Sequence, residues 1–245
     1  MLSSPSGPDR AFRVEGLIAR PFAHRGLHGH GRIENSRAAF QAAIDVGHGI
    51  ELDVQASADG EAMVFHDDRL ERLAESEGPI GGFTAADLTR IRLRNSTETI
   101  PALGEVLQLI AGQAPLLIEL KSSGRGVAAL SGAVNRALAD YVGTVAVMSF
   151  NPAVGRWFAR HAPGVLRGLV VTEAGRPSRG RLRRLIAFFW SKPDFLAYDV
   201  RDLPSVFAQS RRRHGLKLLT WTCRTDAHRS TAEAHADQII YENEG

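Results

Sequence analysis

The 245-residue chain contains a single cysteine, Cys223, so an intrachain disulfide is excluded and nothing demands an oxidising compartment. It has no apolar run long enough to cross a bilayer, and its first 20 residues lack the apolar segment of a secretory signal. We therefore expect a cytoplasmic protein without a transmembrane segment. A chain of this length can bury a large core without disulfides.

Neither sign of charge dominates. The chain has 30 Lys and Arg against 27 Asp and Glu, a formal net charge of +3, which slightly favours anionic small molecules and does not indicate a nucleic-acid partner. The phosphate-binding P-loop, the Gly-x-Ser-x-Gly nucleophile elbow and the dinucleotide fingerprint are all missing. The chemistry therefore has to be sought in other residues.

Short apolar runs alternate regularly with helical patterns along the chain. Eight of these runs are expected to be strands, beginning near Phe22, Ile50, Leu116, Val145, Gly168, Phe195, Lys217 and Gln238. Eight strand–helix units predict a closed (β/α)8 TIM barrel, with a doubly wound open sheet as the alternative. We expect one barrel domain over residues 21–245, without a large insertion and without a regular helix after the last strand.

The flanking and connecting segments carry further expectations. Residues 1–20 should form a tail and lead-in segment, because Met1 to Asp9 is rich in Ser, Pro and Gly. Asn35 is expected to cap a helix over Ser36 to Val46. The run from Leu185 to Trp190 is more apolar than an outer helix needs. We expect it to pack in the core, with a weak membrane-surface or homo-oligomer contact as the alternatives.

Three carboxylates are predicted to converge at one end of the barrel. Glu51 and Asp53 are two residues apart on one strand, so they face the same way, and Glu119 lies on the next principal strand. Active sites of TIM barrels lie at the carboxyl ends of the strands. Clustered carboxylates repel one another, and Mg²⁺ or Ca²⁺, which prefer oxygen ligands, would compensate them. The alternative is pairing of these acids with Arg or Lys inside the barrel.

Two histidines and two cations accompany the acids. His24 and His66 each follow a short apolar run, and together they could act as general acid and base beside a metal-bound phosphate. Each could instead be a buried structural histidine or a metal ligand. Arg25 and Lys121 could hold phosphate oxygens, balance the carboxylates, or do both. A barrel that only binds phosphoesters is disfavoured, because binding does not need two proton-transfer groups.

Short motifs occur in a fixed order from about Phe22 to Ile240. They are His24-Arg25-Gly26, Glu34-Asn35-Ser36, Glu51-Leu52-Asp53-Val54, His66-Asp67, Ile100-Pro101, Glu119-Leu120-Lys121 and Thr220-Trp221-Thr222. Each motif alone is weak, but the ordered set closely resembles the glycerophosphodiester phosphodiesterase family, whose fold is a TIM barrel. One departure is that Tyr241-Glu242-Asn243 stands where the family commonly has Thr-Asp-x-Pro.

The resemblance implies a role for each site residue. The metal ligands for Mg²⁺ or Ca²⁺ would be Glu51, Asp53 and Glu119, and the acid and base would be His24 and His66. Phosphate would be held by Arg25 and Lys121. Glu34 would add to the metal or substrate shell, and Trp221 would line the substrate pocket.

The implied reaction converts a small-molecule glycerophosphodiester and water to glycerol 3-phosphate and an alcohol. An alternative hypothesis is a phospholipase D-like barrel enzyme acting on lysolipids or sphingolipids. That reading needs an apolar rim at the pocket, and Phe188-Phe189-Trp190 would have to lie there.

Overall fold

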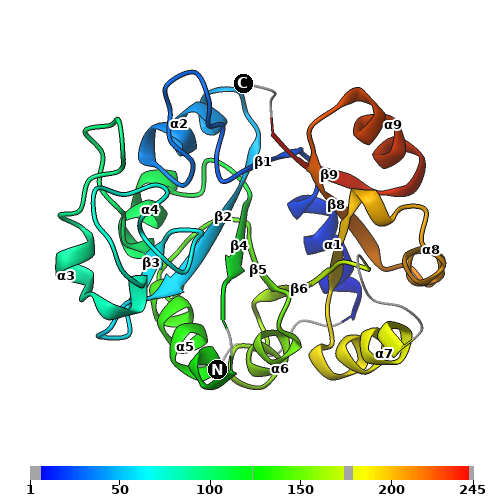
Figure 1. The fold of residues 1–245 in the computed structure, drawn as a ribbon. Coiled ribbons are helices and arrows are strands. Elements are labelled where there is room, and N and C mark those ends of the chain that lie inside the picture. The colour runs from blue at the N-terminus through cyan, green and yellow to red at the C-terminus, as the bar shows by residue number, and fades with distance from the viewer. Residues whose placement is uncertain (1–6, 123, 174–178, 243–245) are drawn as a thin grey trace.

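The computed structural model of the protein describes residues 7–122, 124–173 and 179–242. Eight parallel strands form the barrel: β1 (Phe22–His24), β2 (Gly49–Ala56), β4 (Leu116–Leu120), β5 (Val145–Ser149), β6 (Leu166–Val171), β7 (Phe195–Asp199), β8 (Lys217–Cys223) and β9 (Gln238–Tyr241). Because β1 pairs with both β2 and β9, the sheet closes on itself (Figure 1). The predicted TIM barrel is confirmed and the open sheet is excluded.

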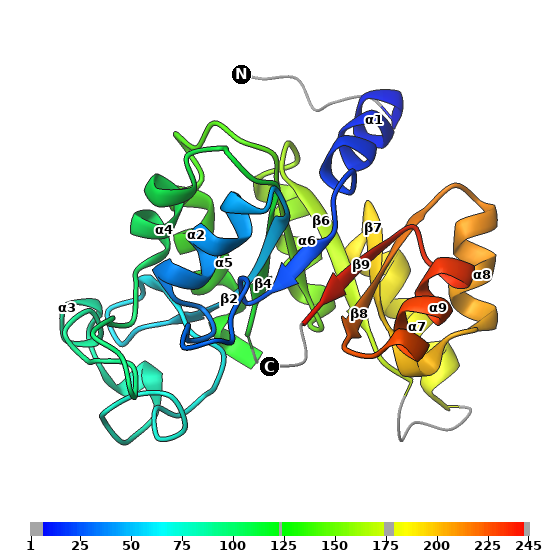
Figure 2. The same ribbon diagram turned by 90° about the horizontal axis from the view of Figure 1, so that it is seen from above.

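Helices surround the strands, as Figures 1 and 2 show. They are α2 (Arg37–Asp45), α4 (Leu103–Ile110), α5 (Val127–Ala137), α6 (Pro152–His161), α7 (Arg179–Ser191), α8 (Val206–Arg213) and α9 (Asp226–His235), with short 3₁₀ turns η2 (Gly124–Gly126) and η3 (Val200–Asp202). The strands are buried along almost their whole length, which is the pattern of parallel strands covered on both faces. The expectation about a helix after β9 concerns residues beyond Glu242, which lie outside the described part of the chain.

One excursion interrupts the strand–helix alternation between β2 and α4. Strand β3 (Ala62–Val64) pairs antiparallel with β2, and η1 (Ile80–Gly82) and α3 (Ala85–Leu88) follow it. This segment has its own apolar core, which includes Met63, Phe65 and Ile100. Its packing fixes the loop that carries His66.

Most of the expected tail, Met1 to Asp9, lies outside the described residues, and its last three residues begin helix α1 (Gly7–Leu17). Val14, Leu17 and Ile18 are at helical spacing and are buried. They pack in one cluster with Phe22 of β1 and Phe195 of β7, at the amino ends of the strands. Helix α1 therefore covers the end of the barrel opposite the predicted site.

The start of helix α2 also differs from the prediction. Its N-cap is Ser36, whose hydroxyl accepts a hydrogen bond from the Ala39 N–H, and Asn35 is one residue outside the helix. Asn35 has a left-handed backbone (φ +57°) and a buried side chain. It is therefore not a cap, and its amide is directed to the site described below.

The expectation that Leu185 to Trp190 packs in the core is wrong for most of the run. Phe189 is 64% exposed and Ile186 58% exposed, because α7 turns only one of its two apolar sides toward the barrel. Phe188 faces inward, against Phe207 of α8. Within the described residues, no helix is both long and apolar enough to span a membrane.

Candidate active site

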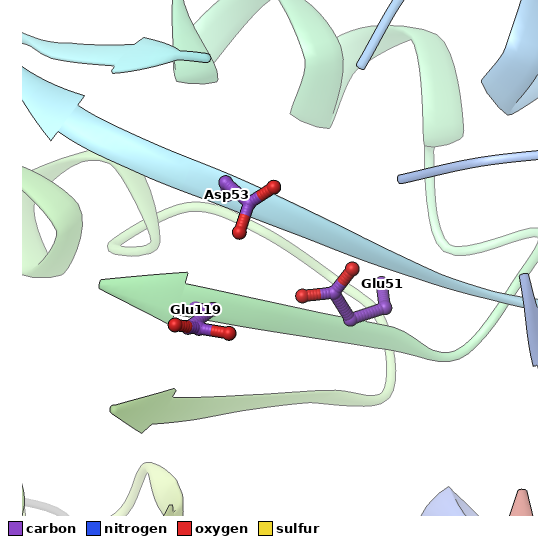
Figure 3. A group of neighbouring side chains, drawn as sticks. All are labelled: Glu51, Asp53 and Glu119. Atoms are coloured by element: carbon purple, nitrogen blue, oxygen red, sulfur yellow. The ribbon is translucent and has the colours of Figure 1, made fainter. Parts of the chain in front are cut away.

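The three predicted acids come together on two neighbouring strands. Asp53 of β2 lies directly beside Glu119 of β4 in the sheet, and Glu51 lies two residues before Asp53 on the same face. Figure 3 shows the three carboxyl groups directed toward a common space. One oxygen from each lies within 4.8 Å of the others, and all three side chains are buried.

Two cations lie among these acids. Lys121 Nζ is 3.0 Å from Asp53 Oδ1 and 2.7 Å from Glu119 Oε1, and Arg25 Nε is 3.3 Å from Asp53 Oδ2. Burial alone would raise the pKa of Asp53, but attraction to Lys121 and Arg25 lowers it to about 2. The charge-balance role proposed for the two cations is thus present in this arrangement.

Glu51 is the least compensated of the three acids. Burial and repulsion from Asp53 and Glu119 raise its pKa well above the usual range. Its Oε2 accepts a hydrogen bond from the Arg25 N–H (3.0 Å), whereas the buried Oε1 has no hydrogen-bond partner. A buried, unpaired carboxylate oxygen beside two more carboxylates fits the oxygen donor set of a hard divalent cation.

Asn35 is a site residue that the sequence reasoning missed. Its side-chain amide donates to Asp53 Oδ2 (3.0 Å), and its carbonyl oxygen accepts from the Asp53 N–H (3.3 Å). The first bond holds one oxygen of the Asp53 carboxylate, and the second ties the Asn35 side chain to the backbone of β2. The chain reaches this position through a turn in which Arg25 and Gly26 both have positive φ, and a Cβ at Gly26 would lie 2.8 Å from the Ala39 backbone.

His24 stands at the end of β1 with each ring nitrogen near a carboxylate. Nδ1 bonds the side chain of Glu242, and Nε2 is 3.9 Å from Glu51 Oε2. Glu242 is itself held by Arg224. Burial lowers the pKa of His24, and the bond to Glu242 opposes that effect. Glu242 is not identified as a site residue from the sequence. There, Tyr241-Glu242-Asn243 is only a departure from the family pattern.

His66 is held in a similar way and lines the same pocket. Its Nδ1 is 2.7 Å from Asp67 Oδ1, and Asp67 is bound by Arg72. Arg72 also binds Glu34, which in turn bonds Arg25 Nη1 (2.8 Å). Glu34 therefore pairs with the guanidinium groups of Arg25 and Arg72, and it lies outside the group of three acids.

A pocket of about 340 Å³ opens over these groups at the carboxyl ends of the strands. Both histidines, Arg25, Glu51, Glu119 and Lys121 line it. Trp221 forms another wall, with its Nε1–H bonded to the Ala197 carbonyl and its ring edge-on to Phe150. Two of the three predicted acids, both cations and both histidines thus line one cavity large enough for a small ligand.

Fold and site together define a TIM-barrel protein with a buried acidic centre, two histidines beside it, and two cationic side chains that can bind phosphate. A model of the glycerophosphoryl diester phosphodiesterase family matches residues 24–244. The match covers most of the chain, which therefore belongs to this family of phosphodiesterases.

Individual relatives agree with the family assignment. A glycerophosphodiester phosphodiesterase of Caldanaerobacter subterraneus subsp. tengcongensis is 28% identical over 84% of this chain and 87% of its own length. A glycerophosphodiester phosphodiesterase of Bacillus altitudinis is 40% identical over 43% of this chain and 46% of its own. The solved structure of an Oleispira antarctica phosphodiesterase with the product sn-glycerol-3-phosphate is 23% identical, covers 94% of both chains and superposes with a TM-score of 0.80, which supports the fold.

Proposed function

We propose that the protein hydrolyses glycerophosphodiesters to glycerol 3-phosphate and an alcohol, with Mg²⁺ or Ca²⁺ as cofactor. The observation that carries the proposal is the matched pair of histidines in one pocket. His24 and His66 each have Nδ1 held by a carboxylate, Glu242 and Asp67 respectively, which leaves Nε2 of each ring available for proton transfer.

Glu51, Asp53 and Glu119 would hold the cation, which when bound supplies positive charge that polarises the phosphate oxygens. Arg25 and Lys121 line the pocket beside these acids, so their donors would hold the same phosphate group. Trp221 would form a wall for the rest of the substrate.

The two histidines would then divide the proton transfers. One takes the proton from the attacking hydroxyl of glycerol or water as the new P–O bond forms. The other gives a proton to the departing alcohol oxygen as the old P–O bond breaks. When water attacks, glycerol 3-phosphate is released directly, and exchange of protons with solvent returns each ring to its starting state. When a glycerol hydroxyl attacks, the product is a cyclic phosphodiester, which water opens in a second step with the roles of the two histidines exchanged.

The test is release of glycerol 3-phosphate by the purified protein from glycerophosphocholine, glycerophosphoethanolamine and glycerophosphoglycerol, with Mg²⁺, Ca²⁺ or EDTA. We expect turnover with metal and none in EDTA. His24→Ala and His66→Ala should each lower kcat by about 10²–10⁴-fold. His214→Ala, in an exposed turn after α8, is the control. Full activity in chelator or in His24→Ala would refute the mechanism.

The lysolipid reading predicts an apolar rim built from Phe188-Phe189-Trp190. Those residues do not line the pocket, whose apolar walls include Phe150, Val170 and Trp221. This supports a water-soluble diester as substrate. Lysophosphatidylcholine belongs in the same panel, and faster turnover of it than of any glycerophosphodiester would favour the lysolipid reading.

A further inference from the structure

Helix α7 carries a second apolar stripe that faces away from the barrel. Its members recur at the spacing of one helical face and are exposed. They are Leu182, Leu185, Ile186, Phe189 and Trp190, with 64, 36, 58, 64 and 46% of their surface exposed. The opposite face of the same helix is already satisfied, since Phe188 packs against Phe207 and Ser191 against Gly155 of α6. The exposed outer stripe is thus not needed to pack α7 against the barrel.

Arginines border this stripe on both sides. At 3.6 residues per turn, Arg181 and Arg183 fall on opposite flanks of the line through Leu182 and Ile186, and both are exposed. Long cationic side chains beside an apolar stripe can bury their stems while their charged ends reach outward. This is the layout of helices that lie in the interface of a membrane.

The charged side chains carried by helices α7 and α8 are all cationic. Neither α7 nor α8 contains an Asp or Glu, and α8 ends in three consecutive arginines. Of the acids nearby, Glu173 binds Arg184 (3.1 Å) and Asp237 binds Arg212 (2.9 Å). Asp202 accepts hydrogen bonds from the Thr172 hydroxyl and the Glu173 N–H. Helices α7 and α8 lie side by side on one flank of the barrel in both views (Figures 1 and 2). That flank therefore presents exposed apolar groups within a cationic field.

A pocket between the two helices strengthens the case for an anionic ligand. Its charged lining consists of three arginines, Arg181, Arg184 and Arg211, and two acids, Glu173 and Asp202, so that cations are in excess. The Nε atoms of Arg184 and Arg211 are buried there without a hydrogen-bond partner. Arg211 is held in place over the rings of Phe188 and Phe207. Buried guanidinium donors beside an apolar stripe suit phosphate groups of lipid heads.

We propose that the α7–α8 face, formed by the outer stripe of α7 and the arginines of both helices, docks on the surface of an anionic phospholipid membrane. A second copy of the chain is the poorer occupant. A two-fold contact through this stripe would set Arg181 and Arg183 of one copy near the same cations of the other. Docking is independent of the hydrolytic chemistry, because the stripe does not line the catalytic pocket.

The experiment is co-sedimentation of the full chain with vesicles of phosphatidylcholine alone or with roughly one-third phosphatidylglycerol. We expect binding only to the anionic vesicles, and release as salt is raised. The double variant Ile186→Glu/Phe189→Glu should bind at least about tenfold more weakly. The matched control is Phe12→Glu/Val142→Glu, which places the same charges at residues that are 77 and 88% exposed elsewhere.

The cationic part of the surface has its own test. Arg183→Gln should weaken vesicle binding about fivefold, whereas Arg69→Gln, far from α7 in sequence and exposed, should not. Turnover of a soluble diester without vesicles should be unchanged in all these variants, so failed docking and failed catalysis can be told apart. Equal binding to both vesicle types, or full binding by Ile186→Glu/Phe189→Glu, would overturn the proposal. So would a dimer in sedimentation equilibrium that the same double variant dissociates.

Discussion

Lys121 Nζ lies 3.0 Å from Asp53 Oδ1 and bridges from there to Glu119 Oε1 at 2.7 Å. The ammonium group thus lies beside the same carboxylates that would hold a divalent cation. Attraction to Asp53 and Glu119 raises the pKa of Lys121 despite its burial. It is therefore protonated at neutral pH and is a counter-ion for the acidic group in the absence of metal.

Replacing this counter-ion should separate its structural and metal-related effects. In EDTA, Lys121→Met should lower the free energy of unfolding by roughly 3 kcal/mol, because buried acids lose their partner. Saturating Mg²⁺ should recover more stability in this variant than in the parent chain. Urea unfolding with and without metal measures both. Lys217→Met, which removes a more exposed ion pair with Glu15, should change stability by less than about 1 kcal/mol. An equal metal effect in the variant and parent would contradict this account.

Metal binding should strengthen as pH rises. Burial raises the pKa of Glu51 and of Glu119, so protons compete with a cation for these carboxylates up to a higher pH than at ordinary glutamates. For Glu51, whose folded pKa exceeds its unfolded value of 4.5, the associated stability is present below pH 4.5 and is lost as pH rises through the folded pKa. Bound metal compensates for the stability that is lost. The difference in Tm between samples in Mg²⁺ and in EDTA should therefore widen from about pH 5 to about pH 8, the range in which proteins are usually most stable. Glu51→Gln should flatten that trend, and a constant gap in the parent chain would show that protons do not compete.

Glu242 should act as a positioning residue for His24. Its carboxylate holds Nδ1 of the ring, and Arg224 holds the carboxylate in turn. Glu242→Gln should lower kcat by roughly 10- to 100-fold, part of what a positioned acid or base contributes, with little change in KM. Glu242→Asp should recover part of the rate if orientation is the cause. The exposed Glu77→Gln is the control. A rise in KM at unchanged kcat would instead assign Glu242 to substrate binding.

Helix α1 should contribute to stability without contributing to chemistry. Leu17 is fully buried against the amino ends of the strands, so Leu17→Ala should cost about 2–5 kcal/mol. Phe12 is 77% exposed on the same helix, and Phe12→Ala should change stability by less than about 0.5 kcal/mol. Thermal unfolding gives the comparison. At a temperature where both variants are folded, kcat should equal that of the parent, and a large loss of kcat would show that the two ends of the barrel are coupled.

The positions of site residues can be predicted from the sequence where the two-residue alternation of side chains along a strand fixes the geometry. Glu51 and Asp53 share a face because strand side chains alternate, and Glu119 joins them because parallel strands in a barrel end at one edge. His24 and His66 could be placed for the same reason, at the ends of apolar runs. These inferences needed only local pattern and the strand count.

The partners of those residues could not be placed in this way. Asn35 reaches Asp53 through a left-handed backbone in an irregular loop, and Glu242 meets His24 across 218 positions of sequence. No periodic pattern encodes either contact. Helix α1 was missed because its buried positions are few among Gly, Pro and charged residues. The prediction that Leu185 to Trp190 packs in the core was wrong because apolar content alone does not show which face of a helix contacts the rest of the protein.

The position of helix α1, which covers the amino ends of the barrel strands, has a consequence for the order of folding. Helix α1 lies near the start of the chain, yet Arg13 bonds the Gly164 carbonyl 151 positions on, and Gln238 bonds the Ile18 carbonyl from 220 positions away. The elements that receive α1 are synthesised long after it. The contacts of α1 with Phe195 of β7 and Ile240 of β9 therefore cannot form until those strands have left the ribosome. One of the earliest segments to be made is among the last that can dock.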